Sequence, residues 1–393
     1  MKQYSIVAII LCVNFFYTLH YTISSYINSS FLEAFAGINY VGIIFTVSAI
    51  CAIAILSQME RLLIRYGNFR VIINTLSIDI CALIGITLYS FYDISISPLI
   101  PIIFFIIHYI SAVFILRCSL DIYYKEETVG RAVGMAQGKL LFTSNVAWLI
   151  SPLIFGQLLT DGDFWRVYLL STVLAIFLLL VVIIYFRNLN EPKYQKIYLR
   201  GTLKEAWKNK DVFRIFSANL LLHIFFSWMI IYLPLHLHET IGFSWKEIGF
   251  LFSLMLIPYV LVDIPFGYIS DKFFGEKELL QIGFLITFAF TFPIALIIEA
   301  NFLLWAIILI GSRLGAATLE VMTDVYFFKK IDERDANLIS FYRNAAPLAY
   351  VAGPFLGSIL LVTGWFTEGL LFIVLSAILF MGLFVIAPLK DTN

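Results

Sequence analysis

Residues 166–186 read RVYLLSTVLAIFLLLVVIIYF, and twenty residues follow Arg166 without a charged side chain. An apolar run of about 20 residues is the length of an α-helix that crosses a bilayer core of about 30 Å. Within lipid the backbone N–H and C=O groups must bond to each other, so a run of this length forms a helix. The aliphatic and phenylalanine side chains are continuous instead of alternating, which argues against a transmembrane barrel.

Runs of the same kind recur along the whole chain. Of its 393 residues, 61% are hydrophobic and only 13% are charged, too few to cover the surface of a soluble protein. We therefore predict an all-α membrane protein with twelve transmembrane helices. The predicted spans are residues 5–27, 38–58, 71–91, 98–120, 134–159, 166–186, 212–238, 246–268, 279–299, 301–327, 338–361 and 369–388.

Lysine and arginine are unevenly distributed among the predicted loops. If both termini are cytoplasmic, the cytoplasmic segments hold twenty of the 26 cations, and the outer loops hold two, Arg166 and Lys246. This positive-inside bias predicts a multi-pass protein of the inner (cytoplasmic) membrane with both termini in the cytoplasm. Because the charges are segregated by side, the net charge of zero gives no support to a nucleic-acid partner. The remaining four cations lie inside spans: Arg117, Lys139, Arg313 and Arg343.

The four cysteines all lie inside predicted spans, at positions 12, 51, 81 and 118. None forms a CxxC pair or falls in an outer loop. We therefore expect no disulfide, no metal site and no cofactor, and interpret the cysteines as small apolar residues in packed helices.

The longest polar stretch divides the chain into two groups of six spans. It reads RNLNEPKYQKIYLRGTLKEAWKNKD, residues 187–211. We predict an N-terminal bundle at residues 1–186, a cytoplasmic linker at 187–211 with a short interfacial helix over 202–210, and a C-terminal bundle at 212–393. The two bundles resemble each other, because the DIYY that begins at Asp121 aligns with the DVYF at Asp324 with a shift of 203. Such internal repeats are common in secondary transporters.

Two loop motifs link these features to a known family. Between spans 8 and 9 the chain reads GYISDK, from Gly267 to Asp271 and Lys272, and before spans 5 and 11 acidic residues precede Arg131 and Arg334. These motifs resemble the loop signatures of the major facilitator superfamily. The match has departures: Gly275 comes one residue late, and the equivalent loop between spans 2 and 3 lacks the leading glycine and the aspartate.

The resemblance implies an alternating-access transporter with two pseudo-symmetric six-helix bundles. It also implies a cytoplasmic gate, in which Asp271 faces the start of span 5 near Arg131 when the cytoplasmic side is closed. Such a contact is made in one conformer and lost in the other. The alternative is that Asp271 is an ordinary solvated loop charge. The predicted gate residues are Gly267, Asp271, Lys272, Arg131 and Arg334.

Proline and glycine lie together inside spans 5 and 11. Proline removes a backbone hydrogen bond and bends the helix, while glycine allows close helix contact. The span 5 motif resembles that of the drug/proton antiporter branch, although Ser151 replaces its glycine. Packing alone is the alternative explanation. The predicted bend residues are Pro152, Gly156, Gly353, Pro354 and Gly357.

Ionisable residues inside a span are candidates for function. Arg313, Glu320 and Asp324 share one face of span 10. With the shift of 203, Arg117 is the counterpart of Glu320, so we expect an ion pair whose partners exchange during transport, or else a permanent salt bridge. Glu320 is the predicted proton carrier and Asp263 the next candidate. Lys139 and Arg343 either reach the interface or contact the ligand.

Uncharged polar residues follow spans 1 and 7. The resemblance places spans 1, 4, 7 and 10 around a central cavity, so we predict that these side chains line it together with Arg117 and Arg313. Bonding between helices is the alternative, since Asn, Ser and Thr bond across membrane helices for about 1 kcal/mol. We expect His108 to be a packing residue; His20 lies off the span 1 stripe, and Asp79 has no assigned role. The predicted lining residues are Asn14, Thr18, Tyr21, Ser25, Asn219 and His223.

These features together predict a secondary active transporter, acting as a monomer in the lipid bilayer, that moves a small molecule with proton coupling. Proton-coupled efflux is the first hypothesis, and an uptake or exchange carrier for a polar or anionic metabolite is the alternative, favoured by the four cations inside spans. A membrane enzyme is disfavoured because the loops are too short for a separate catalytic site.

The predicted topology can be tested by labelling. A cysteine introduced at Lys196 should react only from the cytoplasmic side, and one at Glu33 only from the outside, because an odd number of spans separates them. A membrane-impermeant maleimide applied to intact cells and to inverted vesicles measures this. Reaction of both positions from the same side would contradict the twelve-span arrangement.

Overall fold

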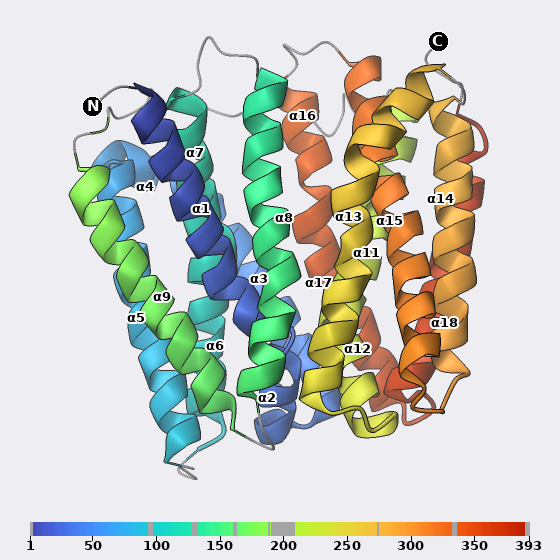
Figure 1. Cartoon of the computed structure of the whole chain (residues 1–393), viewed down its shortest axis with the longest axis horizontal. Coiled ribbons are helices and arrows are strands. Elements are labelled where there is room, and N and C mark those ends of the chain that lie inside the picture. The colour runs from blue at the N-terminus through green and yellow to red at the C-terminus, as the bar shows by residue number, and fades with distance from the viewer. Residues whose placement is uncertain are drawn as a thin grey trace. The chain divides into compact units, whose positions relative to one another are not determined.

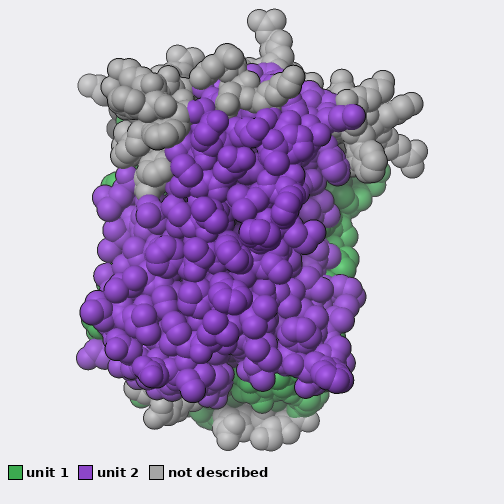
Figure 2. Space-filling view, turned by 90° about the vertical axis from the view of Figure 1, so that its right-hand side faces the viewer, with its two compact units in different colours: residues 1–196, 248–253 green, residues 197–247, 254–393 purple. Residues whose placement is uncertain are grey.

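The computed structural model describes residues 3–92, 97–127, 133–159, 163–187, 189, 209–272, 275–331 and 336–389, and every regular element among them is a helix. The chain separates into two compact units, unit 1 (residues 1–196 and 248–253) and unit 2 (residues 197–247 and 254–393), coloured in Figure 2. The division falls within the predicted linker. The predicted short helix over 202–210 lies outside the described residues.

Unit 1 holds the elements of the N-terminal half, whose order can be followed in Figure 1. They are α1 (Gln3–Ser25), α2 (Asn28–Ala36), α3 (Ile38–Leu56), α4 (Met59–Tyr66), α5 (Asn68–Phe91), α6 (Leu99–Tyr109), the π-helix η1 (Ile110–Leu116), α7 (Arg117–Glu127), α8 (Val133–Leu158) and α9 (Phe164–Tyr185).

Unit 2 holds the elements of the C-terminal half, apart from residues 248–253. They are α11 (Lys210–Ile231), α12 (Leu233–Leu235), the π-helix η2 (His236–Thr240), α13 (Trp245–Lys272), α14 (Glu276–Thr291), the 3₁₀-helix η3 (Phe292–Ala295), α15 (Phe302–Lys330), α16 (Ala336–Arg343), α17 (Ala345–Val362) and α18 (Glu368–Ile386).

Eleven helical segments among the described residues are long and apolar enough to cross a membrane. They correspond to eleven of the twelve predicted spans. The remaining predicted span, residues 246–268, falls within α13, a helix of 28 residues that is described only in part. The prediction of an all-α, multi-pass membrane protein is therefore confirmed.

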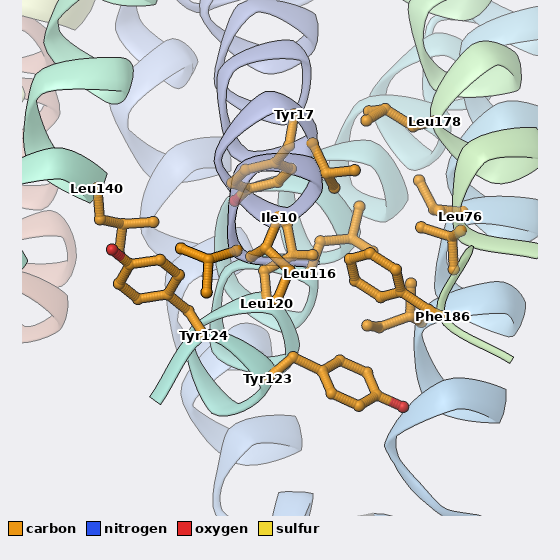
Figure 3. Packing of buried hydrophobic residues seen from close by; sticks show 14 residues of the cluster. Ile10, Tyr17, Leu76, Leu116, Leu120, Tyr123, Tyr124, Leu140, Leu178 and Phe186 are labelled. Atoms are coloured by element: carbon orange, nitrogen blue, oxygen red, sulfur yellow. The ribbon is translucent and has the colours of Figure 1, made fainter. Parts of the chain in front are cut away.

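The core of unit 1 is built around α1, which packs against both α8 and α9. Figure 3 shows Ile10 and Tyr17 of α1 gathered with Leu116, Leu120 and other buried side chains of the unit. Lipid tails are as apolar as these side chains, so burial from water does not hold the helices together. Close packing and hydrogen bonds between helices must do so instead.

The closest helix pair in unit 2 is α14 with α15, and glycine makes this contact possible. A Cβ atom on Gly315 would lie 2.6 Å from the backbone nitrogen of Thr287 and 2.8 Å from the carbonyl oxygen of Gly283. Backbone atoms cannot move aside as a flexible side chain can, so only glycine fits at Gly315. The two backbones are therefore in direct contact, as small-residue interfaces in membranes allow.

The predicted repeat also appears in the helix bounds. Adding 203 to Leu99, where the α6–η1–α7 helix begins, gives Phe302, where α15 begins, and the last described residue of α7, Glu127, corresponds to Lys330 at the end of α15. One copy contains the π-helical stretch Ile110–Leu116, whereas α15 is α-helical throughout. Such bulges widen the helix locally and are frequent at functional sites.

The α14–α15 contact gives a stability prediction. Gly315→Ala should lower the midpoint of thermal unfolding in detergent, by an amount equivalent to about 1–3 kcal/mol, because the added methyl overpacks the interface. Gly138→Ala is the matched control, since a Cβ at that position of α8 meets nothing within 4 Å. Equal midpoints for the two variants would show that the α14–α15 contact can relax.

Candidate functional site

Arg313 is a buried cation near the middle of α15. Only 3% of its surface is exposed, and its Nε and Nη2 atoms have no hydrogen-bond partner among the described residues. Nε–H and Nη2–H lie on the same edge of the guanidinium, the edge that can hold two oxygens of a carboxylate or phosphate at once. An unpaired buried charge costs several kcal/mol, so this edge is a site at which an anion would be stabilised.

Two aromatic rings of α11 face the Arg313 guanidinium. Its Cζ lies 5.2 Å from the ring centroid of Phe225 and 5.7 Å from that of Phe226. The negative face of an aromatic ring attracts a cation by about 0.5–2 kcal/mol, which offsets only part of the cost of burial. The rings also exclude water from the guanidinium, so an anion bound there would interact through a low dielectric.

His223, also on α11, lies beside Phe226. Its ring contacts the Phe226 ring with centroids 5.5 Å apart, and its Nδ1 lies 2.9 Å from the carbonyl oxygen of Asn219. A carbonyl oxygen only accepts, so Nδ1 carries the hydrogen and the neutral ring keeps its lone pair on Nε2. Arg313, His223 and Phe226, from two of the helices expected to line the cavity, thus form one contiguous polar and aromatic group in unit 2.

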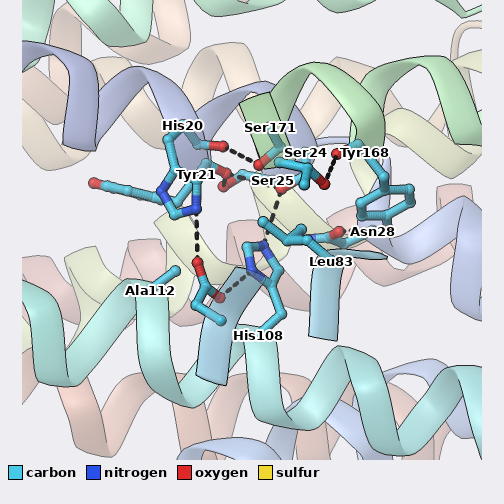
Figure 4. Close-up of polar contacts among 12 residues, drawn as sticks. His20, Tyr21, Ser24, Ser25, Asn28, Leu83, His108, Ala112, Tyr168 and Ser171 are labelled. Atoms are coloured by element: carbon cyan, nitrogen blue, oxygen red, sulfur yellow. Dashed lines mark hydrogen bonds and ion pairs between the residues drawn. The ribbon is translucent and has the colours of Figure 1, made fainter. Parts of the chain in front are cut away.

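A second charged group lies inside unit 1, formed by three residues that were not predicted to meet. Asp79 of α5 lies between two histidines: its Oδ2 is 2.8 Å from Nε2 of His20, and its Oδ1 is 2.7 Å from Nδ1 of His108. All three side chains are buried, and the bonds around the two histidines are drawn in Figure 4. Their facing atoms lie within 4.8 Å of one another, as a metal ion would require. Distances of 2.7–2.8 Å are those of charge-assisted hydrogen bonds, and we describe the group as a hydrogen-bonded triad.

The comparisons with known proteins agree with this architecture. Residues 215–393 match the family model of the Major Facilitator Superfamily. The matching part of the chain, just under half of its length, resembles the Major Facilitator Superfamily. The predicted family and its twelve-helix fold are thereby confirmed, and the chain is assigned to a superfamily of carriers, not of enzymes. The drug/proton antiporter branch stays a prediction, and a search of curated proteins finds no match.

Several solved structures of transporters share the fold over almost their full length. The nucleoside transporter NupG has a TM-score of 0.76 at 12% identity, with 99% of this chain and 100% of that chain covered. A bacterial homologue of the iron transporter ferroportin, inward-facing, and a D-xylose-proton symporter each have a TM-score of 0.75 at 14% identity, with 98% of this chain and 99% of theirs covered. At these identities the likeness supports the fold alone.

The charged residues of the superfamily's repeated helix have separate partners. In unit 1, Nε of Arg117 lies 3.3 Å from Oδ2 of Asp121, one turn along the same helix. In unit 2, Asp324 accepts a hydrogen bond of 2.8 Å from Tyr342. Arg313 forms no ion pair with any described residue, and Glu320 lies two turns away on α15. The exchanging pair of Arg117 and Glu320 stays a prediction.

The polar stripe of span 1 bonds to a neighbouring helix. The Asn14 amide nitrogen lies 2.8 Å from Thr143 Oγ1, 2.9 Å from Ser144 Oγ and 3.2 Å from the Leu140 carbonyl oxygen, all on α8. Farther along the stripe, Tyr21 packs its ring edge-on against another α8 residue, the aromatic Trp148.

Thr18 and Ser25 complete that stripe. Thr18 Oγ1 lies 3.5 Å from Ser144 Oγ, whereas the Ser25 hydroxyl bonds to its own helix at the Tyr21 carbonyl. The described contacts of Asn14 and Thr18 thus join α1 to α8, and cavity lining stays a prediction for all four residues.

The proline and glycine residues of α17 have specific partners in unit 2. Trp228 Nε1 donates to the carbonyl oxygen of Gly353 at 2.6 Å, and the Tyr232 hydroxyl donates to that of Pro354 at 2.9 Å. A Cβ on Gly357 would lie 2.5 Å from the Tyr232 hydroxyl oxygen. These residues therefore let α11 approach the α17 backbone closely.

In α8, Pro152 lies inside the helix, and Gly156 follows one turn later. A Cβ on Gly249, in the α13 stretch that belongs to unit 1, would lie 2.4 Å from the Pro152 carbonyl oxygen and 3.1 Å from Gly156 Cα. Both residues therefore lie in a close helix contact, as small residues in membrane helices allow.

The predicted gate lies largely outside what the structure describes. Arg131 and Arg334 are not among the described residues. Gly267, Asp271 and Lys272 lie near the end of α13, and Asp263 lies one to two turns earlier, but only the backbone is described there. The cytoplasmic gate and the role of Asp263 stay predictions.

The contacts of Asn14 separate the two interpretations of the span 1 stripe. If Asn14 joins α1 to α8, Asn14→Ala should lower the midpoint of thermal unfolding by an amount equivalent to about 1–2 kcal/mol. Ser25→Ala should leave it unchanged, because that hydroxyl bonds only within α1. An unchanged midpoint for Asn14→Ala, with weaker substrate binding, would instead support cavity lining.

Proposed function

We propose that this protein is a secondary active transporter for a small organic anion that carries a carboxylate, and that Arg313 binds this group. The observation that carries the proposal is the open Nε–Nη2 edge of a guanidinium that is 97% buried, since only 3% is exposed. A carboxylate would supply the missing charge and accept two hydrogen bonds in one plane.

The neighbouring side chains fit the rest of such a substrate. Phe225 and Phe226 offer apolar surface next to the carboxylate site, and the His223 ring adds a polar group at its edge. Small-molecule sites have this composition, mostly apolar walls with a few placed polar groups. The relatives named above include carriers of a nucleoside and of xylose with protons, so the fold accommodates polar substrates.

This proposal takes up the alternative hypothesis from the sequence, a carrier for an anionic metabolite, in preference to proton-coupled efflux of apolar molecules. A buried guanidinium with unpaired N–H groups is better matched by an anionic substrate than by an apolar one. The span 5 residues that favoured efflux, Pro152 and Gly156, lie in a close helix contact with Gly249, so packing is sufficient to explain them. The direction of transport and proton coupling through Glu320 or Asp263 stay predictions.

Counterflow in proteoliposomes tests the proposal. Vesicles loaded with one compound exchange it for the labelled compound outside, and a panel of carboxylates, sugars, nucleosides and cationic drugs identifies the class that exchanges. Carboxylates should exchange, and Arg313→Gln should weaken their binding by about 10- to 100-fold, the equivalent of about 1.5–3 kcal/mol for a hydrogen bond to a charged group. Arg313→Lys should restore the charge but not the two-point geometry, and recover binding only in part.

Arg214→Gln is the matched control. Arg214 also lies in unit 2, on the same helix as Phe225, but pairs with Asp211 at 3.2 Å. Its loss should leave exchange unchanged. Exchange of only neutral or cationic compounds, or normal carboxylate binding by a folded Arg313→Gln variant, would contradict the proposal.

A further inference from the structure

The triad of unit 1, which consists of His20, Asp79 and His108, is negatively charged unless one of its histidines takes up an additional proton. An ionised Asp79 only accepts hydrogen bonds, so His20 Nε2 and His108 Nδ1, the nitrogens that face it, both carry hydrogens. With both rings neutral, the buried group has a net charge of −1. One further proton on either ring makes it neutral, the state that a site inside a membrane favours.

The second nitrogen of each histidine decides which ring takes that proton. His20 Nδ1 is buried and has no hydrogen-bond partner among the described residues. A proton there would be a buried donor without an acceptor, which is costly. His108 Nε2 instead lies 3.3 Å from the hydroxyl oxygen of Ser24. The proton is therefore accommodated on His108.

Ser24 can serve both states of His108. Its hydroxyl oxygen lies 3.1 Å from the Tyr21 carbonyl oxygen and 3.3 Å from His108 Nε2, and it has one hydrogen to donate. When that hydrogen points to Tyr21, the oxygen accepts from a protonated Nε2. When it turns to His108, it donates to the lone pair of the neutral ring. A rotation of one hydroxyl thus keeps both protonation states hydrogen-bonded.

Other titratable groups around the triad are engaged elsewhere. Tyr17 donates to the Ala112 carbonyl oxygen at 2.6 Å, and Tyr168 of α9 donates to Asn28 Oδ1 at 2.7 Å. Tyr21 packs against Trp148. The nearest charged residues of the same long helix, Arg117 and Asp121, pair with each other, and Glu33 of α2 is partly buried. His20 and His108 donate the side-chain hydrogen bonds that Asp79 accepts.

We propose that His108, held between Asp79 and Ser24, is a proton-binding site that couples the proton gradient to transport. This inference rests on the proposed transport function. Coupling of the proton to transport requires only that the two conformers of the transport cycle bind this proton with different affinities. The triad is formed by side chains of unit 1, whereas Arg313 belongs to unit 2. It offers a different proton carrier from Glu320, and the two can be compared directly.

Transport measurements on the reconstituted full chain separate coupling from substrate binding. His108→Gln and Asp79→Asn should abolish accumulation of the anion driven by a pH gradient while counterflow at equal pH continues. Ser24→Ala should weaken accumulation, and Thr22→Ala is the matched control, a buried hydroxyl two residues away that bonds to the Leu19 carbonyl. Accumulation that survives in His108→Gln, or that is lost only in Glu320→Gln, would overturn the proposal.

A spectroscopic measurement does not depend on the substrate. In protein with ¹⁵N-labelled histidine, the His108 ring should gain a second ring proton when the pH is lowered, and Ser24→Ala should alter this change. His20→Gln can still donate a hydrogen bond to Asp79, so this variant should preserve the change in His108 protonation. It takes the place of Asp79→Asn if that variant fails to fold. A His108 ring that stays neutral throughout, or stoichiometric Zn²⁺ binding in equilibrium dialysis that Asp79→Asn removes, would overturn the proposal. If no anion exchanges in the counterflow experiment, the proposed function is wrong. The spectroscopic measurement still shows in that case whether His108 binds a proton.

Discussion

The cost of an unpaired charge inside a membrane is the constraint on which this molecule depends. A charged side chain at the centre of a transmembrane helix costs a few kcal/mol or more, so each one needs a partner or a use. Arg117 has Asp121, and Asp79 has two histidines. Among the residues that the structure describes, Arg313 has only the faces of two rings, which compensate a fraction of that cost. A bound anion would compensate the rest of this free-energy cost. We connect Arg313 with the substrate for this reason.

The two copies of the internal repeat have equivalent helices but carry different charged residues. The α6–η1–α7 helix and α15 begin at equivalent residues after a shift of 203, yet their charged positions differ. Ile110 occupies the position of Arg313, and Arg117 that of Glu320. Both copies keep the aspartate that follows, Asp121 and Asp324. Equivalent helices thus give each unit the same framework, while the triad belongs to unit 1 and the open guanidinium to unit 2.

The sequence predicted what depends on local composition and missed what depends on contacts between helices. Spans were found because hydropathy along about 20 residues is a local property, and the repeat because its aspartate motif is short and ungapped. The triad was missed because His20, Asp79 and His108 come from three helices and lie off the predicted stripes. Three ionisable residues at similar depth in spans 1, 3 and 4 were the available signal. The bonds of Asn14 to α8 could not be predicted either, since helical spacing shows which residues share a face but not what that face meets.

The most direct test of the central claim compares two ligands that differ only in charge. Once a carboxylate substrate is identified, its binding to the purified protein should be measured by calorimetry beside that of its primary amide, which has nearly the same shape and no charge. We expect the carboxylate to bind at least about tenfold more tightly, because only it neutralises the Arg313 guanidinium and accepts hydrogen bonds from both Nε–H and Nη2–H. Equal affinities for the acid and the amide would show that Arg313 does not bind a substrate carboxylate.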